Sequence, residues 1–436
     1  MAKPALPGPV EKGEAAPAAC TRVIPATQLT IDGTDKGAEV HPGDVLCLPA
    51  GTRGNLKLMN LVGAPGKPII VRNNGGVTVI TGAQFGDGAL QIIASRYLHV
   101  TGIGAGTQCG AAFDAADQHC GIDIRNAPKG VKISTDRGTV SDIEIDHIAV
   151  DELSKEKKTR GIAIHPLPGQ LISGISIHHN YVANSLAEGI YVGSEPHDQP
   201  LATLAKVERV NVSWNLVEHT GYDGIKIKVA IRGVAVHHNV IHDAGVSHTP
   251  AHEGGIKVAF STGDYYSNTV IGAVEGIRMG RGLEWPGTRY YNNVIANVVD
   301  VGIEAEEDGA TIVNNTVVGS QKVGISAPGV ASYVAGNLVV DAKLPLLVAG
   351  EATSNVVTTS ALASFVAPAA KDFRIRANSP AIDAGPVQGP IICGTEYLPA
   401  PKARVRVEPS DLDRADGPRM IGCQTDAGAY EGAPSS

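Results

Sequence analysis

Aromatic side chains are scarce in this sequence. Only 4% of its 436 residues are Phe, Trp or Tyr, whereas 52 residues are Gly. This mix favours thin, repeated strands and turns over a bulky globular core. By length alone the chain could form two or three domains, but a single solenoid can include most of it.

The sequence also lacks an excess of basic residues and any long apolar run. Its 36 Lys and Arg residues stand against 44 Asp and Glu, a formal net charge of −8. General attraction to nucleic acid is therefore not expected. No apolar run approaches the ~18 residues of a membrane span, so we expect no membrane insertion.

The first 19 residues are rich in Ala and Pro and show no periodicity. We expect residues 1–19 to be a flexible lead-in. They contain no apolar segment of the kind found in signal peptides. If the protein is exported, we expect that the signal was removed or lies outside this sequence.

The six cysteines lie outside the central repeats, and no CxxC spacing indicates a zinc site. They fall into sequence-neighbouring pairs. Among the possible pairings we expect Cys20–Cys47, Cys109–Cys120 and Cys393–Cys423. Three disulfides predict an extracellular or periplasmic protein. The alternative is a cytosolic protein with buried free thiols.

A short phrase recurs seven times between Gly174 and Val340. Each copy carries an Asn, at Asn180, Asn215, Asn239, Asn268, Asn293, Asn315 and Asn337. By subtraction the spacing falls from 35 residues (180 to 215) to 22 residues (315 to 337), which is a solenoid period. Apolar residues follow two apart, as in Ile225 and Ile227. That is the period of a strand and not of a helix.

Strands this short cannot bury a core within one repeat and must stack on their neighbours. The sequence therefore predicts an all-β fold, a single-stranded right-handed parallel β-helix over residues 20–365, with strands ~4.8 Å apart. The repeated Asn residues are expected to be structural, because inward amides at a bend can hydrogen-bond along the stack. Residues 366–436 are expected to form a capping C-terminal segment over the open end of the stack.

Two stretches resemble known β-helix proteins. The phrase HPGDVLCLPAG, followed by GAPGKPIIVRNNGGVTVITG, resembles the opening of extracellular proteins of the chondroitinase B and alginate lyase group. The phrase KDFRIRANSPAIDAG (Lys371–Gly385) resembles a tail found on many secreted bacterial β-helix proteins. The resemblances imply the β-helix fold and secretion.

A basic stripe is expected on one face of the β-helix. The residue after each Gly-Ile pair lies in one outward column, and this column contains Lys226, Lys257 and Arg278 on successive coils. Like charges ~5 Å apart on a sheet repel one another. The stripe therefore predicts a groove for a polyanionic sugar chain, or else a solvated patch that nearby acids balance.

Removing the proton beside a uronate carboxylate needs a base and a cation that stabilises the developing charge. We assign Lys257 as the base and Arg278 as the carboxylate-binding residue, with Lys226 as the alternative base. In the chondroitinase B and alginate lyase group the base and its partner are likewise a Lys and an Arg on nearby coils, which this pair resembles. The expected substrate contacts are Lys228, Arg281, Tyr191, His165 and Glu304.

A further phrase, GSEPHDQP (Gly193–Pro200), is similar to the Asp-Pro-His motif of mannuronan C5-epimerases. Glu195 stands in the place of the Asp, and His197 matches the His. The resemblance implies a catalytic role for His197. The alternative is an exposed loop histidine.

Acidic residues precede the Gly-Ile pairs, and oxygen-rich sets of this kind can bind Ca²⁺. We assign Asp223, Glu253 and Glu275 as candidate calcium ligands, with turn formation as the alternative. The histidines are expected at exposed turn positions, because no HxH motif with a suitably placed carboxylate is present.

The sequence thus predicts a monomeric, extracellular or periplasmic lyase that cleaves an acidic polysaccharide by abstracting the C5 proton of a uronate. A polysaccharide C5-epimerase shares this first step and is the alternative enzyme. A non-catalytic carbohydrate-binding adhesin is the alternative without chemistry. Polygalacturonase-type hydrolysis needs paired carboxylates on adjacent coils, and no Asp-Asp phrase is present.

Overall fold

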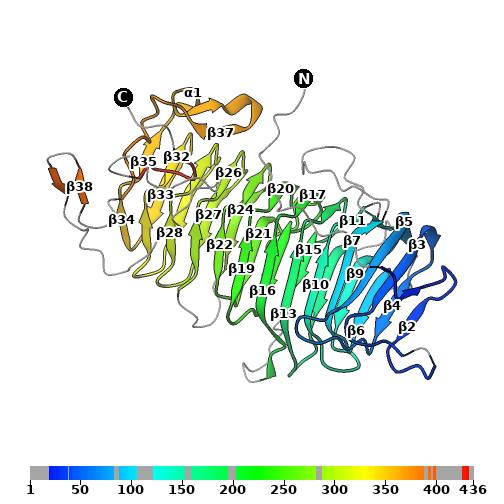
Figure 1. The fold of residues 1–436 in the computed structure, drawn as a ribbon. Helices are drawn as coiled ribbons and strands as arrows, with labels where there is room; N and C mark the ends of the chain where they lie inside the picture. Colours follow the sequence, from blue (N-terminus) through cyan, green and yellow to red (C-terminus); the bar gives the residue numbers. More distant parts are fainter. Residues whose placement is uncertain are drawn as a thin grey trace. The chain divides into compact units, whose positions relative to one another are not determined.

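The structure, a computed structural model, describes residues 19–37, 39–82, 88–105, 121–151, 153, 159–194, 203–280, 287–386, 391–393, 396–398 and 425–431. It contains two compact units. The described residues of unit 2 lie within Ala5–Ala235 and Gly245–His252, and those of unit 1 within Val236–Ala244 and Glu253–Ser436. The coils are those of a right-handed parallel β-helix, as the sequence predicts (Figure 1).

Unit 2 builds its coils from two sheets of parallel strands. In sheet B neighbouring strands pair in register, for example Ile162 with Ile190 and Ile190 with Ile225. The strands of sheet B are β2 (Thr30–Asp32), β4 (Leu56–Met59), β6 (Leu90–Ile93), β9 (Lys129–Ser134), β12 (Arg160–His165), β15 (Ile190–Val192) and β18 (Ile225–Lys228). Those of sheet A are β1 (Arg22–Val23), β3 (Val45–Arg53), β5 (Ile69–Thr81), β7 (Arg96–Ala105), β8 (Ile122–Arg125), β10 (Ser141–Asp146), β11 (Ile148–Val150), β13 (Leu171–His178), β14 (Tyr181–Ala183), β16 (Lys206–Ser213) and β17 (Leu216–Thr220).

Unit 1 repeats this plan with shorter coils. Its sheet B contains β21 (Gly254–Ala259), β24 (Glu275–Met279), β27 (Val301–Ala305), β30 (Val323–Ala327) and β33 (Leu344–Val348). Its sheet A contains β20 (Val240–Ala244), β22 (Asp264–Tyr266), β23 (Thr269–Ile271), β25 (Arg289–Tyr291), β26 (Val294–Ala296), β28 (Thr311–Val313), β29 (Thr316–Val318), β31 (Tyr333–Ala335), β32 (Leu338–Val340), β34 (Glu351–Thr353) and β35 (Val356–Thr358). The division between the units falls within β19 (Val234–His237).

The alternation of side chains along the strands explains where the core lies. In β13, Ile175 and Ile177 are buried, whereas Ser176 and His178 are half-buried on the outer face. Because successive side chains of a strand point to opposite faces, each coil contributes apolar residues to the interior. The polar residues between them form columns on the outside, where a functional site can be built.

The repeated Asn residues form hydrogen-bonded ladders, which confirms their predicted structural role. In unit 2, Asn180 Nδ2 donates to Asn215 Oδ1 at 3.0 Å. In unit 1 the same bond links each member to the next at 2.9–3.0 Å, through Asn239, Asn268, Asn293, Asn315, Asn337 and Asn355. Each side-chain amide thus gives the next one a hydrogen-bond partner, which offsets the cost of burying a polar group.

Asn293→Ala is expected to lower the free energy of unfolding by about 2–3 kcal/mol, because buried partners lose their hydrogen bonds. Asn293 Nδ2 donates to Asn315 Oδ1 and to the Tyr265 carbonyl, and its Oδ1 accepts from Asn268. Urea unfolding measures the change. The exposed Asn378 provides the control, since Asn378→Ala should cost less than ~0.5 kcal/mol. Equal losses in the two variants would contradict the role of the ladder.

The first predicted disulfide is confirmed, and it joins Cys20 to Cys47. The bond joins the segment just before β1 to β3. The strands β1 and β3 are parallel neighbours in sheet A. The pair Cys109–Cys120 lies outside the described residues. The pair Cys393–Cys423 also stays a prediction, because Cys423 lies outside them and the side chain of Cys393 is not described.

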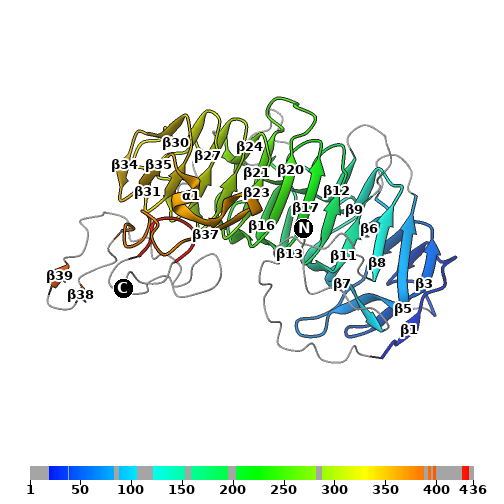
Figure 2. The ribbon, with the colours of Figure 1, turned by 90° about the horizontal axis from the view of Figure 1, so that it is seen from above.

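The C-terminal segment of unit 1 packs along the coils. It contains α1 (Ala361–Ser364), β36 (Phe365–Ala367), the 3-10 turn η2 (Pro368–Ala370) and β37 (Asp372–Ile375), followed by the separate hairpin of β38 (Ile391–Cys393) and β39 (Glu396–Leu398). Phe365, Phe373 and Tyr430 cluster with residues at the ends of β23, β26, β29 and β32. Figure 2 shows α1 and β37 beside the coils of unit 1. The described contact therefore runs beside several coils, and the predicted cap over the end of the stack stays a prediction. In the described part of the chain, no helix has the length and apolarity that crossing a bilayer requires.

Candidate functional site

Four residues singled out from the sequence lie together on sheet B of unit 2. Lys226 in β18 pairs in register with Tyr191 in β15, which pairs with Ala163 in β12. His165 follows two residues after Ala163, and its ring stacks on that of Tyr191 with centroids 4.9 Å apart. Asp223 precedes β18 and contacts Lys226. The predicted column of side chains therefore exists within unit 2.

Lys226 is enclosed by acids. Its ammonium lies 2.9 Å from Asp223 Oδ2 and 3.3 Å from Glu188 Oε1. Both carboxylates are fully buried, and Lys226 is 1% exposed. The expected neighbours were cations in an open groove, so the surroundings of Lys226 differ from the sequence-based expectation. The physical reason is that the acids before the Gly-Ile pairs turn toward the lysine column and compensate its charge.

An imidazole and a guanidinium complete this group, which we call the lysine cluster: Arg160, Glu188, Asp223, Lys226 and His252. Lys226 Nζ donates to His252 Nδ1 at 2.8 Å. Arg160 Nε donates to Glu188 Oε2 at 2.6 Å. The side chains of Arg160 and His252 are 19% and 33% exposed. Basic groups therefore reach the surface above a buried pair of carboxylates.

Aromatic rings hold the two exposed groups in place. The Arg160 guanidinium lies over the Tyr191 ring, 4.6 Å from its centroid. The ring of Tyr222 lies 4.7 Å from that of His252. Cation–π contact and ring packing limit the freedom of both side chains. With a neutral His252, the two cations and two carboxylates of the lysine cluster balance.

The lysine cluster also bears on the calcium prediction. Oxygen or nitrogen atoms of Glu188, Asp223 and His252 lie within 4.8 Å of one another, as in a cation site. The Lys226 ammonium, however, already lies 2.8–3.3 Å from all three side chains. Ca²⁺ takes six to eight oxygen ligands and would have to displace this ammonium. These residues therefore fit a fixed ammonium better than Ca²⁺, and calcium binding stays a prediction.

The predicted catalytic pair lies in unit 1. Lys257 in β21 pairs in register with Arg278 in β24, and Arg278 pairs with Glu304 in β27. Arg278 forms ion pairs with Glu275, Glu304 and Glu306. Burial opposes its charge, but these carboxylates outweigh it and raise the pKa of Arg278. The guanidinium is thus already matched by protein carboxylates.

The other predicted site residues lie in unit 1, in unit 2 or outside the described residues. Burial raises the pKa of Glu275, which is paired with Arg278. Glu253 and Lys228 are half-buried, in unit 1 and unit 2 respectively. His197 and Arg281 lie outside the described residues. The catalytic and binding roles assigned to all these residues from the sequence stay predictions.

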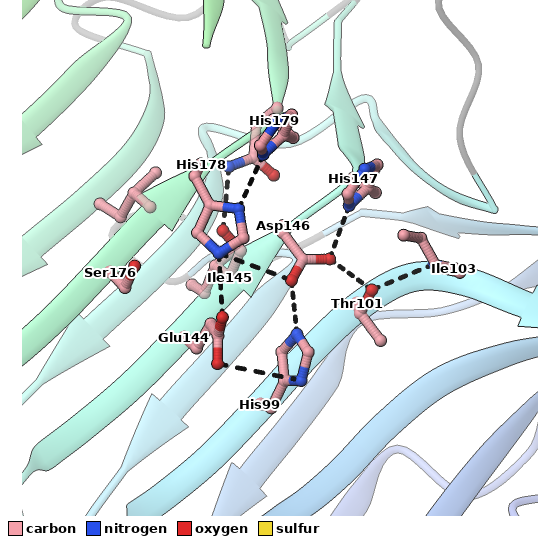
Figure 3. A network of polar contacts seen from close by, with 12 residues as sticks. His99, Thr101, Ile103, Glu144, Ile145, Asp146, His147, Ser176, His178 and His179 are labelled. Atoms are coloured by element: carbon pink, nitrogen blue, oxygen red, sulfur yellow. Dashed lines mark hydrogen bonds and ion pairs between the residues drawn. The ribbon is translucent and has the colours of Figure 1, made fainter. Parts of the chain in front are cut away.

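A second polar group in unit 2, which the sequence patterns did not predict, we call the histidine cluster. It contains His99, Glu144, Asp146 and His178, from the neighbouring sheet A strands β7, β10 and β13 (Figure 3). It borders a cleft of about 410 Å³ whose lining includes His99, Glu144 and Ser176. The available signal was alternation: Glu144 and Asp146 are two residues apart in one strand and so share a face.

Comparison with known proteins agrees with the fold. A family model described as a right handed beta helix region matches residues 169–339. A search of curated proteins gave no match. Among solved structures, the chain is similar to a GH136 lacto-N-biosidase from Eubacterium ramulus, with 15% identity and a TM-score of 0.46 over 73% of this chain and 62% of that chain.

Two lyases also show similarity to the chain. An alginate lyase from Paenibacillus sp. str. FPU-7 has 16% identity and a TM-score of 0.40, over 78% of this chain and 99% of that chain. The pectate lyase Pel9A has 13% identity and a TM-score of 0.42, over 95% of this chain and 97% of that chain. The chain spans less than two thirds of the lacto-N-biosidase. At these identities an activity has to be inferred from the side chains of the chain itself.

Proposed function

We propose that the chain is a lyase that cleaves an acidic, uronate-containing polysaccharide at the lysine cluster of unit 2. The observation that carries the proposal is the arrangement of this cluster. Two partly exposed basic side chains, Arg160 and His252, lie above Lys226 and two fully buried carboxylates. Basic groups at the surface suit an anionic sugar, and the buried acids hold them in fixed positions.

The first chemical requirement is a group that holds the uronate carboxylate. A planar guanidinium matches a carboxylate with two parallel N–H bonds. The bond from Arg160 Nε to Glu188 and the contact with Tyr191 set the orientation of this guanidinium. Charge that develops on the carboxylate when the C5 proton leaves would be stabilised by Arg160.

The second requirement is a proton-transfer group. Lys226 Nζ and His252 Nδ1 are joined by a 2.8 Å hydrogen bond. In the reactive form Lys226 is uncharged and His252 Nδ1–H donates to its amine, so His252 Nε2 takes the C5 proton while the Nδ1 proton passes to Lys226. His252 Nε2 then gives its proton to the leaving glycosidic oxygen and Lys226 returns a proton to Nδ1, which leaves a double bond between C4 and C5. Lys226 lies too deep to touch the sugar, so His252 makes the contact and Lys226 positions its ring and supplies the proton.

Localisation belongs to the same proposal. The Cys20–Cys47 disulfide favours an oxidising compartment. An extracellular or periplasmic protein would meet acidic polysaccharides there.

Incubation with pectate, alginate and glycosaminoglycans tests the proposal, with ultraviolet absorbance of the unsaturated uronate as the readout. His252→Gln is expected to lower turnover at least ~100-fold, the usual scale of a lost proton-transfer group. The exposed His248 belongs to the same segment as His252, so His248→Gln serves as the matched control and should retain full turnover.

Other outcomes assign other functions. Exchange of solvent deuterium into C5 without chain cleavage would identify an epimerase in place of a lyase. Polysaccharide binding without either reaction would identify a non-catalytic binder. Turnover that His252→Gln leaves unchanged would show that the lysine cluster is not the active site.

A further inference from the structure

The histidine cluster lies on sheet A of unit 2, apart in the fold from the strands of the lysine cluster. Asp146 in β10 pairs in register with Thr101 in β7 and with His178 in β13. Glu144, two residues earlier in β10, pairs with His99 in β7. Three adjacent parallel strands therefore bring two imidazoles and two carboxylates to one outer face (Figure 3).

The nitrogen and oxygen atoms of this cluster converge. His99 Nε2 lies 2.5 Å from Asp146 Oδ2, and His178 Nε2 lies 3.8 Å from the same oxygen. His178 Nε2 is also 2.9 Å from Glu144 Oε1. Ligand atoms of His99, Glu144 and Asp146 lie within 4.8 Å of one another, and His178 Nε2 contacts both carboxylates from the next strand. In a tetrahedral zinc site, bonds of ~2.0–2.1 Å place neighbouring ligand atoms about 3.4 Å apart. The three separations given above, 2.5, 2.9 and 3.8 Å, span this value.

Charge compensation of the two carboxylates depends on the imidazoles of the cluster or on a bound cation. Asp146 is 4% exposed. Within the described residues, the side-chain partners of Glu144 and Asp146 are imidazoles and the Thr101 hydroxyl, with no Lys or Arg among them. Neutral imidazoles leave two negative charges close together on a partly buried face, which is costly unless a cation compensates them.

The neighbouring side chains orient the prospective ligands as the outer shell of a metal site does. His178 Nδ1 lies 2.9 Å from His179 Nδ1, and this hydrogen bond directs His178 Nε2 toward the carboxylates. The second oxygen of Asp146, Oδ1, accepts from Thr101 and lies 2.8 Å from His147 Nδ1. Asp146 Oδ2 is thereby directed toward His99 and His178.

From this geometry we propose that unit 2 binds a divalent transition metal of the Zn²⁺ class at the histidine cluster. His99 Nε2, His178 Nε2, Asp146 Oδ2 and Glu144 Oε1 are the ligands. Two imidazoles among four ligands select Zn²⁺ and its transition-metal neighbours over Ca²⁺ and Mg²⁺, which prefer oxygen. His99 and Glu144 also line the cleft of about 410 Å³, which gives an ion a route from solvent. The site does not depend on the proposed lyase activity.

Calorimetric titration of the full chain with Zn²⁺ tests the proposal, after treatment with a chelator and alkylation of free thiols. One Zn²⁺ is expected to bind per chain, while Ca²⁺ at the same concentration gives no comparable heat. His178→Gln and His99→Gln should each weaken Zn²⁺ binding at least ~100-fold, because losing a ligand exceeds the 10–100-fold cost of losing an outer-shell partner. His248→Gln, at an exposed position, should bind as the unaltered chain does.

The absorption spectrum of bound Co²⁺ gives a second readout, because tetrahedral nitrogen and oxygen ligation differs from thiolate ligation. Thermal unfolding of each variant without metal shows whether it has folded. Folded His99→Gln and His178→Gln variants that keep full Zn²⁺ affinity would overturn the proposal. Loss of Zn²⁺ binding in His252→Gln in place of His178→Gln would also overturn it, because the ion would then lie in the lysine cluster.

Discussion

Lys226→Met is expected to lower the free energy of unfolding by about 3–5 kcal/mol, the usual cost of removing one partner from a buried ion pair. Glu188 and Asp223 are both fully buried beside the Lys226 ammonium. Without that ammonium, two carboxylates stay in a poorly solvated site where their negative charges are less well compensated. The midpoint of urea unfolding at neutral pH measures the loss.

A matched substitution separates this effect from the loss of a lysine in general. Lys322 pairs with Asp300 at 2.7 Å, but its side chain is 64% exposed. Lys322→Met should therefore cost far less stability than Lys226→Met. Adding Glu188→Gln and Asp223→Asn to Lys226→Met should recover part of the lost stability, because the stranded charges are then removed. If Lys226→Met costs no more than Lys322→Met, the carboxylates do not depend on the ammonium.

Glu307→Gln is expected to remove a pH dependence of about 3 kcal/mol from the stability of the protein. Burial raises the pKa of Glu307 to about 7, from the ordinary value of 4.5 for a glutamate. The difference of about 2.5 pH units corresponds to about 3 kcal/mol at 1.36 kcal/mol per unit. The side chain is held in the interior of unit 1, where Tyr290 Oη donates to Glu307 Oε1 at 3.2 Å.

The direction of this effect follows from proton binding. Below pH 4.5 both the folded and the unfolded chain carry the proton, so the stability contribution is fully present. As pH rises from 4.5 to about 7, the unfolded chain loses its proton first, and the contribution of the folded state falls. Above about pH 7 the contribution stays constant at its lowest value.

Urea unfolding of the unaltered chain and of Glu307→Gln across this pH range measures the difference. The unaltered chain should lose about 3 kcal/mol more than the variant between pH 4.5 and pH 7.5. Glu351→Gln is a suitable control, because Glu351 is exposed on β34. Parallel pH profiles for the unaltered chain and Glu307→Gln would show that this carboxyl ionises normally in the folded state.

The fold was predictable because its determinants are local and repeated. Each Asn phrase forms the same bend, and in each Gly-Ile phrase apolar side chains recur at every second residue. The stacking of the coils therefore follows from the spacing of these phrases in the sequence. The same logic correctly placed Lys257 beside Arg278. The first disulfide was also predictable, because Cys20 and Cys47 are consecutive cysteines, with no other cysteine between them.

The surroundings of the site residues were much harder to predict. A column of lysines in the sequence predicts a basic surface. The acids that precede the strands turn toward this column, however, as Glu188 and Asp223 do around Lys226. The histidine cluster was missed for a different reason. His99 and Asp146 are 47 residues apart, and the phrase around His99 lacks the repeated Asn. Only the register of β7 against β10 reveals that they meet.

The Asn ladder has a consequence for how such a chain changes length in evolution. Asn293 and Asn315 are 22 residues apart and make equivalent bonds to the coils on either side. Removing or duplicating residues 294–315 as a block would rejoin equivalent backbone positions and preserve the amide-to-amide chain. Shorter insertions preserve it where they fall in a turn, because the ladder also joins members that are 29 and 25 residues apart. Gene duplication can therefore add whole coils to unit 1, whereas smaller length changes are confined to the turns.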